Sequence, residues 1–156
     1  MISSGTGTMS LNEEVDLLRK IPLFSNIEPS KLKLLAFTSE RLKFREGAEL
    51  FHQGDMGDSA YIIIDGSVEI IVSTPNGDVK VAHVNKNDIV GEIAILCDVP
   101  RTATVIADQD IEVLKISKEL FFQMVGEFPQ MAVEIMRELA MRLEKTTSQL
   151  TQALNS

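Results

Sequence analysis

The hydrophobic pattern divides the chain into helical stretches at both ends and a central region of short strands. Apolar positions at helical spacing predict a helix over Leu11–Lys20 and a second helix that starts near Pro29, a residue suited to the first helical position. After residue 40 the pattern changes to short β-favouring runs between glycines, and after Ile116 the helical spacing returns. This order predicts a mainly β domain with flanking helices.

The central region carries turn signals at near-regular intervals. Asn76-Gly77 lies between two apolar runs and predicts a tight hairpin, because both residues tolerate positive φ angles. Many short strands with such spacing are typical of a barrel or a jelly roll. We therefore predict a β-roll or jelly-roll barrel of the mainly β, α+β class. Its predicted strands are Glu49–His52, Ser59–Ile64, Ser67–Ser73, Val79–Val84, Thr102–Ala107 and Ile111–Ile116.

Two further helices are predicted after the strands. Ser117 is a good N-cap for the first helix, and Gly126 is its expected C-cap. Pro129 then opens a helix that is expected to run to about Ala153. We interpret the chain as a flexible tail followed by a single domain. The tail is 1–10 and the domain 11–156, with N-terminal helices in 11–40, the β-roll in 41–116 and C-terminal helices in 117–156.

Charge and composition disfavour several kinds of partner. The 156 residues carry a formal net charge of −8, whereas nucleic acids and anionic membranes attract basic surfaces. The longest unbroken apolar run, Ala60–Ile64, is far shorter than a membrane span. Cys97 is the single cysteine and cannot form an internal disulfide, so a reducing, cytoplasmic location is expected. Neither nucleic acid nor a membrane is therefore a predicted partner.

The residue types also argue against enzymatic and metal chemistry. The two histidines, His52 and His83, have no neighbour at ligand spacing, so a metal-binding cupin is not expected. Cys97 has no evident base to activate it as a nucleophile, and no P-loop is present. We therefore predict that the chain is not an enzyme and holds no metal or cofactor.

One stretch of the strand region, residues 89–105, combines the features of an anion site. Glu92 begins a short helix-compatible run, and Gly91 before it allows a ligand to approach the backbone closely. The free N–H groups of a helix start favour an anion, and Arg101 offers a fork of donors for phosphate oxygens. Glu92 then needs a donor of its own, which a sugar hydroxyl group supplies. These residues predict a small phosphate ester with a free hydroxyl group as the ligand.

This stretch resembles the phosphate-binding cassette of cyclic nucleotide-binding domains, as in catabolite activator proteins and protein kinase A regulatory subunits. It matches through Gly91-Glu92-Ile93-Ala94 and Pro100-Arg101-Thr102-Ala103. The glycine-punctuated stretch upstream, which includes Gly54-Asp55 and Gly66-Ser67-Val68, resembles the β-roll of the family. The resemblance covers roughly Ile21 to Leu150.

The resemblance implies a role for each residue of the cassette. Gly91 and Ile93-Ala94 would present backbone N–H groups to the cyclic phosphate. Glu92 would accept the ribose 2′-hydroxyl group, and Arg101 would pair with the phosphate oxygens. Thr102-Ala103 would add short polar contacts.

The long C-terminal helix carries an apolar seam in which Met136, Leu143 and Leu150 are seven residues apart. Such a seam of about three heptads indicates a coiled coil, although its first half is also suited to packing on its own barrel. In catabolite activator proteins the matching helix pairs two subunits and carries a Thr-Ser that touches the adenine amino group. Thr146-Thr147 looks similar in place and type, which implies a homodimer and cyclic AMP.

Base preference nevertheless stays open at Thr102. In cyclic GMP-dependent kinases a threonine directly after the arginine favours guanine, so cyclic GMP is the alternative ligand. We predict a non-catalytic sensor that binds cyclic AMP, or cyclic GMP, and signals through its C-terminal helices to a second copy or a protein effector. The competing hypothesis is a degenerate, ligand-free β-roll that serves as a dimerisation or protein-interaction module.

Overall fold

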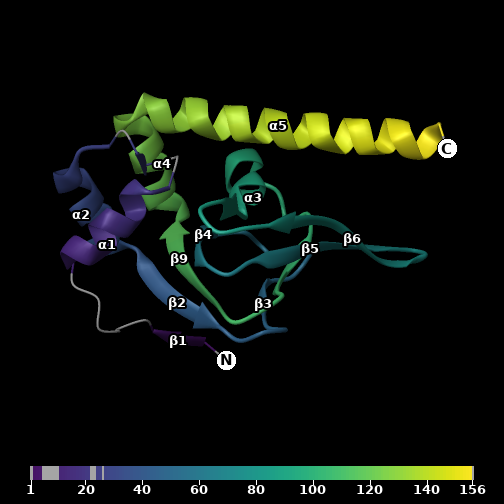
Figure 1. Ribbon diagram of the computed structural model, residues 1–156, viewed down its shortest axis with the longest axis horizontal. Helices are drawn as coiled ribbons and strands as arrows, with labels where there is room; N and C mark the ends of the chain where they lie inside the picture. The colour runs from purple at the N-terminus through teal and green to yellow at the C-terminus, as the bar shows by residue number, and fades with distance from the viewer. Residues whose placement is uncertain (1, 5–10, 22–23, 26, 156) are drawn as a thin grey trace.

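Two antiparallel sheets form the centre of the computed structural model, which describes residues 2–4, 11–21, 24–25 and 27–155 (Figure 1). The first sheet contains, in spatial order, β1 (Ile2–Ser4), β2 (Glu40–Phe44), β9 (Ile111–Ser117), β4 (Ser59–Asp65) and β7 (Ile89–Val90). The second contains β3 (Glu49–Phe51), β8 (Thr104–Ala107), β5 (Val68–Thr74) and β6 (Gly77–Val84). The helices are α1 (Leu11–Arg19), α2 (Pro29–Thr38), α3 (Glu92–Cys97), α4 (Lys118–Glu127) and α5 (Pro129–Leu154).

The mainly β class with flanking helices is confirmed. The β-roll is an open pair of sheets rather than a closed barrel, since the strands divide into two separate ladders. The predicted hairpin is present, but its turn residues are Pro75 and Asn76 rather than Asn76 and Gly77, because Thr74 of β5 pairs with Gly77 of β6. Gly77, directly after the turn, adopts a φ of 113°, a positive angle that a glycine accommodates without strain.

Strand β4 is buried on both of its faces. Ala60, Ile62 and Ile64 belong to a core that the first sheet shares with the helices. Tyr61 and Ile63 point the other way, into a core between the two sheets. Successive side chains of a strand alternate between its faces, so an unbroken apolar run is the pattern of a strand covered on both sides.

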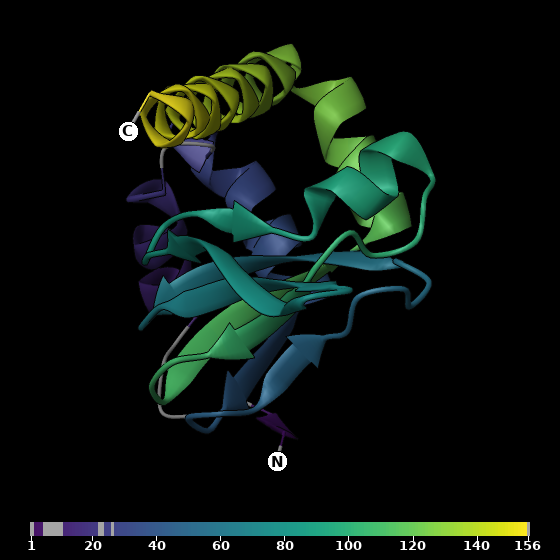
Figure 2. The same ribbon diagram turned by 90° about the vertical axis from the view of Figure 1, so that its right-hand side faces the viewer.

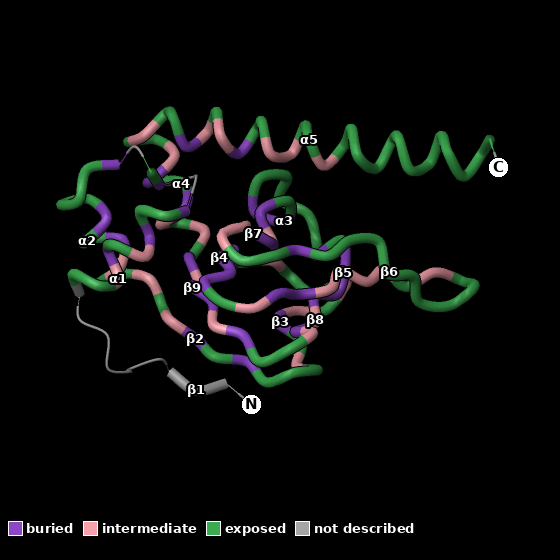
Figure 3. The backbone as a smooth tube through the Cα atoms, in the orientation of Figure 1, coloured by how far each residue is buried: buried purple, intermediate pink, exposed green. Residues whose placement is uncertain are grey.

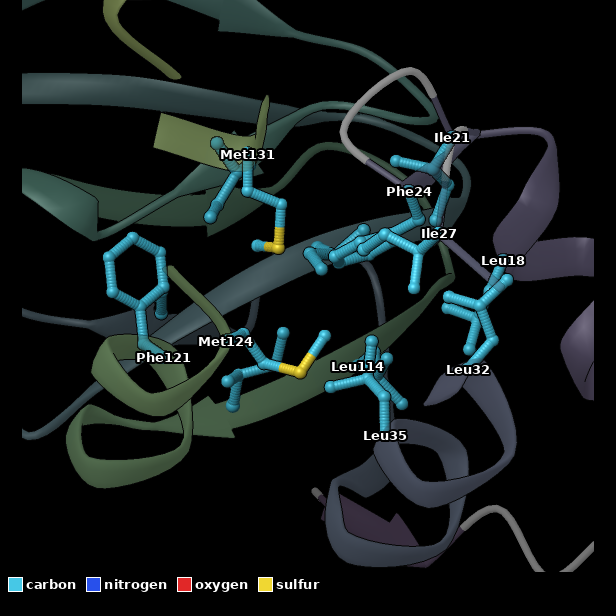
Figure 4. Close-up of a cluster of buried hydrophobic side chains, with 14 of the residues drawn as sticks. Leu18, Ile21, Phe24, Ile27, Leu32, Leu35, Leu114, Phe121, Met124 and Met131 are labelled. Carbon is cyan, nitrogen blue, oxygen red and sulfur yellow. The ribbon is translucent and has the colours of Figure 1, made fainter. Parts of the chain in front are cut away.

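The two cores hold the sheets and helices together. The core between the sheets contains Leu42, Phe44, Leu50, Tyr61, Ile63, Val68, Val84, Val90, Val105, Ala107, Ile111 and Val113. The core under the helices contains Leu18, Phe24, Leu35, Leu114, Phe121, Met124 and Met131 among others (Figure 4). It also contains Ile95 of α3, so the short helix of the cassette region is anchored in the helical core.

Helix α5 has a packed half and an exposed half. Met131 and Ile135 are buried, whereas the side chains beyond Arg142 are exposed along the outer part of the helix (Figure 3). Figure 2 shows α5 lying above both sheets. The seam residues Met136, Leu143 and Leu150 are 61%, 68% and 58% exposed. The first half of the helix therefore packs on its own domain through Met131, Ile135 and the partly buried Leu139, whereas the predicted seam residue Met136 is exposed.

The end of α4 differs from the sequence prediction. Ser117 is its N-cap, as predicted, and accepts a hydrogen bond from the Leu120 N–H group at 3.1 Å. Gly126 is not the C-cap, because the helix continues to Glu127 and Phe128 occupies the cap position. Phe128 precedes Pro129, and a residue before proline disfavours the helical conformation. The proline therefore ends this helix where a glycine was expected to do so.

The N-terminal region also differs in part. Ile2–Ser4 form β1, which pairs with Leu42–Phe44 of β2, so the prediction of a flexible tail is wrong for these three residues. The rest of the predicted tail lies outside the described residues. Strand β2 was not among the predicted strands because its sequence, Glu-Arg-Leu-Lys-Phe, has only two apolar positions. Both of them, Leu42 and Phe44, are buried.

Candidate ligand-binding site

A cavity of about 80 Å³ lies at the junction of the second sheet, α3 and α5. The sheet supplies Phe51, Ile70 and Val105, and α5 supplies Arg142. The remaining lining residues are Val90 and all of the residues predicted for the cassette, namely Gly91, Glu92, Ile93, Ala94, Arg101, Thr102 and Ala103. The structure therefore brings the two predicted parts of the cassette together around one space.

The backbone at Gly91 explains why a glycine precedes α3. Gly91 has a φ of +86°, in the left-handed region that side chains rarely adopt. A Cβ atom at Gly91 would lie 2.7 Å from Nη1 of Arg101 and 3.2 Å from the ring of Phe51. The glycine therefore meets both a conformational requirement and a steric one.

Arg101 is buried in the wall of the cavity with only 4% of its surface exposed. Its Nη1 donates to the carbonyl oxygen of Gly91 at 2.9 Å, and its Nη2 donates to that of Ser59 at 2.7 Å. Its Nε is buried without a hydrogen-bond partner among the described residues. Burial lowers the pKa of the guanidinium, which nevertheless stays charged because arginine is far too basic to lose its proton in a protein.

An unpartnered buried donor of this kind is unfavourable by about 1–3 kcal/mol. A guanidinium has five N–H donors, so Arg101 keeps capacity for an anion after its two backbone bonds. The two backbone bonds also fix where the group sits. Arg101 is thus a cation that is held in place and incompletely paired, which is the arrangement expected of an anion-binding residue.

Glu92 is also buried, with 2% of its side chain exposed. Its Oε1 accepts a hydrogen bond from Nη1 of Arg142 at 2.9 Å. Burial raises the pKa of the Glu92 carboxyl group, and the charge of Arg142 opposes that shift. The carboxylate predicted to meet a ribose hydroxyl group is therefore also bound to α5.

Arg142 is the centre of a charged contact between α5 and the cassette. Its Nη2 donates to the carbonyl oxygen of Ile89 at 2.7 Å, and it lies 3.5 Å from the carboxylate of Glu138. Burial, together with a hydrogen bond and repulsion from Asp88, raises the pKa of Glu138 to about 8. Two acids, Glu92 and Glu138, thus contact Arg142, and Asp88 acts on both of these acids.

Sequence reasoning missed the roles of Phe51 and Arg142. The Cζ atom of Arg101 lies 4.0 Å from the centroid of the Phe51 ring, in cation–π geometry. Arg142 precedes Thr146 by one helical turn, and residues four apart share a helix face. That spacing is a usable signal, since Thr146 is a predicted site residue on the same helix.

Thr146 and Thr147 lie on the exposed outer half of α5, outside the lining of the cavity. The hydroxyl group of Thr146 donates to the carbonyl oxygen of Arg142 at 2.9 Å. Their predicted contact with a base involves a second subunit and stays a prediction.

Two negative findings apply to the described part of the chain. It holds no group of three or more His, Cys, Asp or Glu side chains that could bind a metal ion. None of its helices combines the length and the apolar character that crossing a bilayer requires.

Fold and site together define a class of protein. The open β-roll carries a cavity whose lining includes a buried arginine, a buried glutamate and the start of α3. The profile of the cyclic nucleotide-binding domain family matches residues 41–128. The chain belongs to this family.

Its relatives include regulatory proteins from fungi and bacteria. The cAMP-dependent protein kinase regulatory subunit of Colletotrichum orbiculare is 32% identical over 111 residues, which are 71% of this chain and 28% of that protein. The CRP-like cAMP-activated global transcriptional regulator of Mycobacterium tuberculosis is 26% identical over 136 residues, which are 86% of this chain and 61% of that protein. The chain thus spans less than two thirds of the length of these relatives.

Solved structures show the same fold. A cyclic nucleotide-binding domain from Methylobacillus flagellatus superimposes with a TM-score of 0.80 at 21% identity, over 97% of this chain and 89% of that one.

Proposed function

We propose that this chain is a non-catalytic regulatory domain that binds cyclic AMP in the cavity and signals through α4 and α5. The observation that carries the proposal is Arg101, a buried cation whose Nε has no hydrogen-bond partner among the described residues. A cyclic phosphate supplies the negative oxygens that such a group prefers. The names of the two curated relatives, which call them cAMP-dependent and cAMP-activated, favour cyclic AMP over cyclic GMP.

Different residues around the cavity would bind the phosphate and the ribose of the ligand. Arg101 and the backbone N–H groups of Gly91 and Ile93-Ala94 would bind the phosphate. Glu92 would accept a hydrogen bond from the ribose hydroxyl group, because its carboxylate can accept more hydrogen bonds than the one from Arg142. Thr102 and Ala103 also line the cavity and would contact the bound ligand.

The signal has a physical route to the helices. Ile95 of α3 is buried in the core that contains Phe121 of α4 and Met131 of α5. A ligand that draws α3 toward the cavity therefore has to change the packing of both helices. The resulting coupling is no larger than the difference in ligand affinity between the two arrangements.

A second copy of the chain is the proposed partner of the outer half of α5. Leu143 and Leu150 are more than half exposed and are seven residues apart, which is the spacing of a coiled-coil seam. A cytoplasmic location and a protein effector belong to the same proposal. The competing proposal, a ligand-free dimerisation module, uses the same exposed seam but needs neither Arg101 nor Glu92.

Calorimetric titration with cyclic AMP, cyclic GMP and linear 5′-AMP tests this proposal. We expect micromolar or tighter binding of a cyclic form and weaker binding of the linear one. Arg101→Ala should cost about 2–4 kcal/mol, which is a loss of about 30- to 700-fold in affinity. Arg137→Ala, which removes an exposed arginine paired with Glu134, is the matched control. No binding by protein freed of nucleotide would favour the ligand-free module.

A further inference from the structure

We propose that Phe51 is a positioning residue of the anion site, whose ring holds the guanidinium of Arg101 in the plane in which it meets the ligand phosphate. This inference rests on the proposed function and names a residue through which the site achieves its affinity. Phe51 is the last residue of β3 and lines the cavity. It reaches the ligand through Arg101.

The contact itself is close and well placed. The Cζ atom of Arg101 lies 4.0 Å from the centroid of the Phe51 ring. The Phe51 ring is in turn 5.9 Å from the ring of Tyr61, at a tilted angle of 31°. Tyr61 is buried in the core between the sheets, so the surface under the guanidinium is anchored rather than loose.

The backbone of two glycines, Gly57 and Gly91, also lies close to the guanidinium of Arg101. A Cβ atom at Gly57 would lie 3.2 Å from Nε and 3.3 Å from Cζ of Arg101, and one at Gly91 would lie 2.7 Å from Nη1. A side chain at either glycine would therefore crowd the guanidinium, whereas the Phe51 ring contacts it at 4.0 Å.

The hydrogen bonds of Arg101 do not fix the tilt of the guanidinium plane. The Phe51 ring determines that orientation. Two bonds, from Nη1 to Gly91 and from Nη2 to Ser59, fix the position of the guanidinium in its own plane. Stacking on an aromatic face determines the orientation of the plane, which hydrogen bonds at two edge atoms define only loosely. A long side chain that is ordered before the ligand arrives loses less entropy on binding.

The ring also compensates for the surroundings of the charge. Among the described residues no carboxylate forms an ion pair with Arg101, although Asp55, Asp58 and Glu92 act on it from further away. The negative face of an aromatic ring attracts a cation, most strongly where water is excluded. Phe51 thus keeps a buried charge in place without neutralising it, so the charge is left for the phosphate.

Three variants separate stacking from ordinary packing. Phe51→Leu keeps an apolar side chain but removes the aromatic face, and we expect cyclic AMP affinity to fall about tenfold. Phe51→Tyr keeps the face and should bind within about threefold of the parent. Phe37→Leu is the matched control, because Phe37 is 81% exposed and lies on α2, and its affinity should equal that of the parent. Thermal unfolding of each ligand-free variant shows whether it is folded.

A double-mutant cycle with Arg101→Lys distinguishes orientation of the guanidinium from a purely structural role of Phe51. A structural role would give the same loss of cyclic AMP affinity in both backgrounds. An ammonium group has no plane to orient, so Phe51→Leu should weaken binding by less than about threefold in the Arg101→Lys background. A full tenfold loss in that background overturns the inference, as does parent-like affinity of Phe51→Leu or a loss in Phe51→Tyr equal to that in Phe51→Leu. If the parent chain itself binds no cyclic nucleotide, the proposed function fails first and takes this inference with it.

Discussion

Removal of Arg142 leaves a buried carboxylate without its cation. The Glu92 side chain is 2% exposed and that of Arg142 is 33% exposed, so truncation of the arginine strands the more buried partner. Losing one partner of a fully buried pair costs about 3–5 kcal/mol of folding free energy. Because Arg142 is partly exposed, water can reach the space that it vacates, and the cost at Glu92 should fall near or below the lower end of that range.

Proton uptake sets an upper limit to this cost. A stranded Glu92 can always take up a proton. Its ordinary pKa is 4.5, so at pH 7.5 the pH lies three units above the pKa at which protonation is free of cost. Three units correspond to about 4 kcal/mol, whereas half a unit at pH 5 corresponds to about 0.7 kcal/mol. We therefore expect Arg142→Ala to lose about 2–3 kcal/mol of stability at pH 7.5, which is below this limit.

The sign of the pH dependence follows from the same reasoning. Burial already raises the pKa of Glu92 in the folded chain, and the loss of Arg142 raises it further. The folded variant then binds a proton that the unfolded chain releases, so stability falls as the pH rises from about 4.5. The gap between Arg142→Ala and the parent should be small at pH 5 and wide at pH 7.5.

Urea denaturation at both pH values measures these differences directly. Arg137→Ala is the control on the same helix, because its ion pair with Glu134 is largely exposed and should contribute less than about 1 kcal/mol. In a Glu92→Gln background, Arg142→Ala should cost less, since no buried carboxylate is left at position 92 and only the contacts of Arg142 with Ile89 and Glu138 are lost. A loss at pH 7.5 that is equal in the two backgrounds, or absent in the parent background, refutes the reasoning.

Two further predictions concern the same region. The raised pKa of Glu138, about 8, means that the folded chain keeps a proton that the unfolded chain loses, so stability falls between about pH 4.5 and 8. Glu138→Gln cannot titrate and should flatten this decline in denaturation curves, and an unchanged slope would contradict the raised pKa of Glu138. Gly91→Ala places a Cβ atom 2.7 Å from Nη1 of Arg101 at a φ of +86°, so it should lose both stability and cyclic AMP affinity. Gly54→Ala has a similar φ of +93° with nothing within 4 Å, so it isolates backbone strain, and equal losses of affinity in both variants would count against the steric argument.

Local patterns were sufficient for most of the elements. The Ser117 N-cap and the proline at position 129 act on neighbouring residues, and each predicted where a helix begins. The Asn76-Gly77 signal predicted a hairpin at the right place, although the turn residues are Pro75 and Asn76. The cassette was found in the same way, because its helix start and Arg101 lie within one short stretch. Gly126 failed because two competing end signals, a glycine and the Phe128-Pro129 pair, lie within the same turn.

The partners of the two charged site residues were beyond the reach of such patterns. Glu92 binds Arg142, which is 50 residues further along the chain, and Arg101 stacks on Phe51, a comparable distance before it. These contacts depend on how α5 crosses the cassette and on how β3 pairs with β8. Hydrophobic periodicity predicts that a helix has a packed face, but it does not state which charged group lies opposite.

The shared use of Glu92 connects the proposed binding event to α5. One carboxylate oxygen of Glu92 already accepts a hydrogen bond from Arg142, whose other nitrogen holds the carbonyl oxygen of Ile89. If a ribose hydroxyl group bonds to the same carboxylate, it alters the charge that Arg142 experiences and hence the position of α5. By linkage, the factor by which the ligand shifts the equilibrium of α5 equals the factor by which the position of α5 changes ligand affinity. A cross-link that holds α5 against the cassette should therefore shift the cyclic AMP dissociation constant, and an unchanged constant would place the signal in α4 alone.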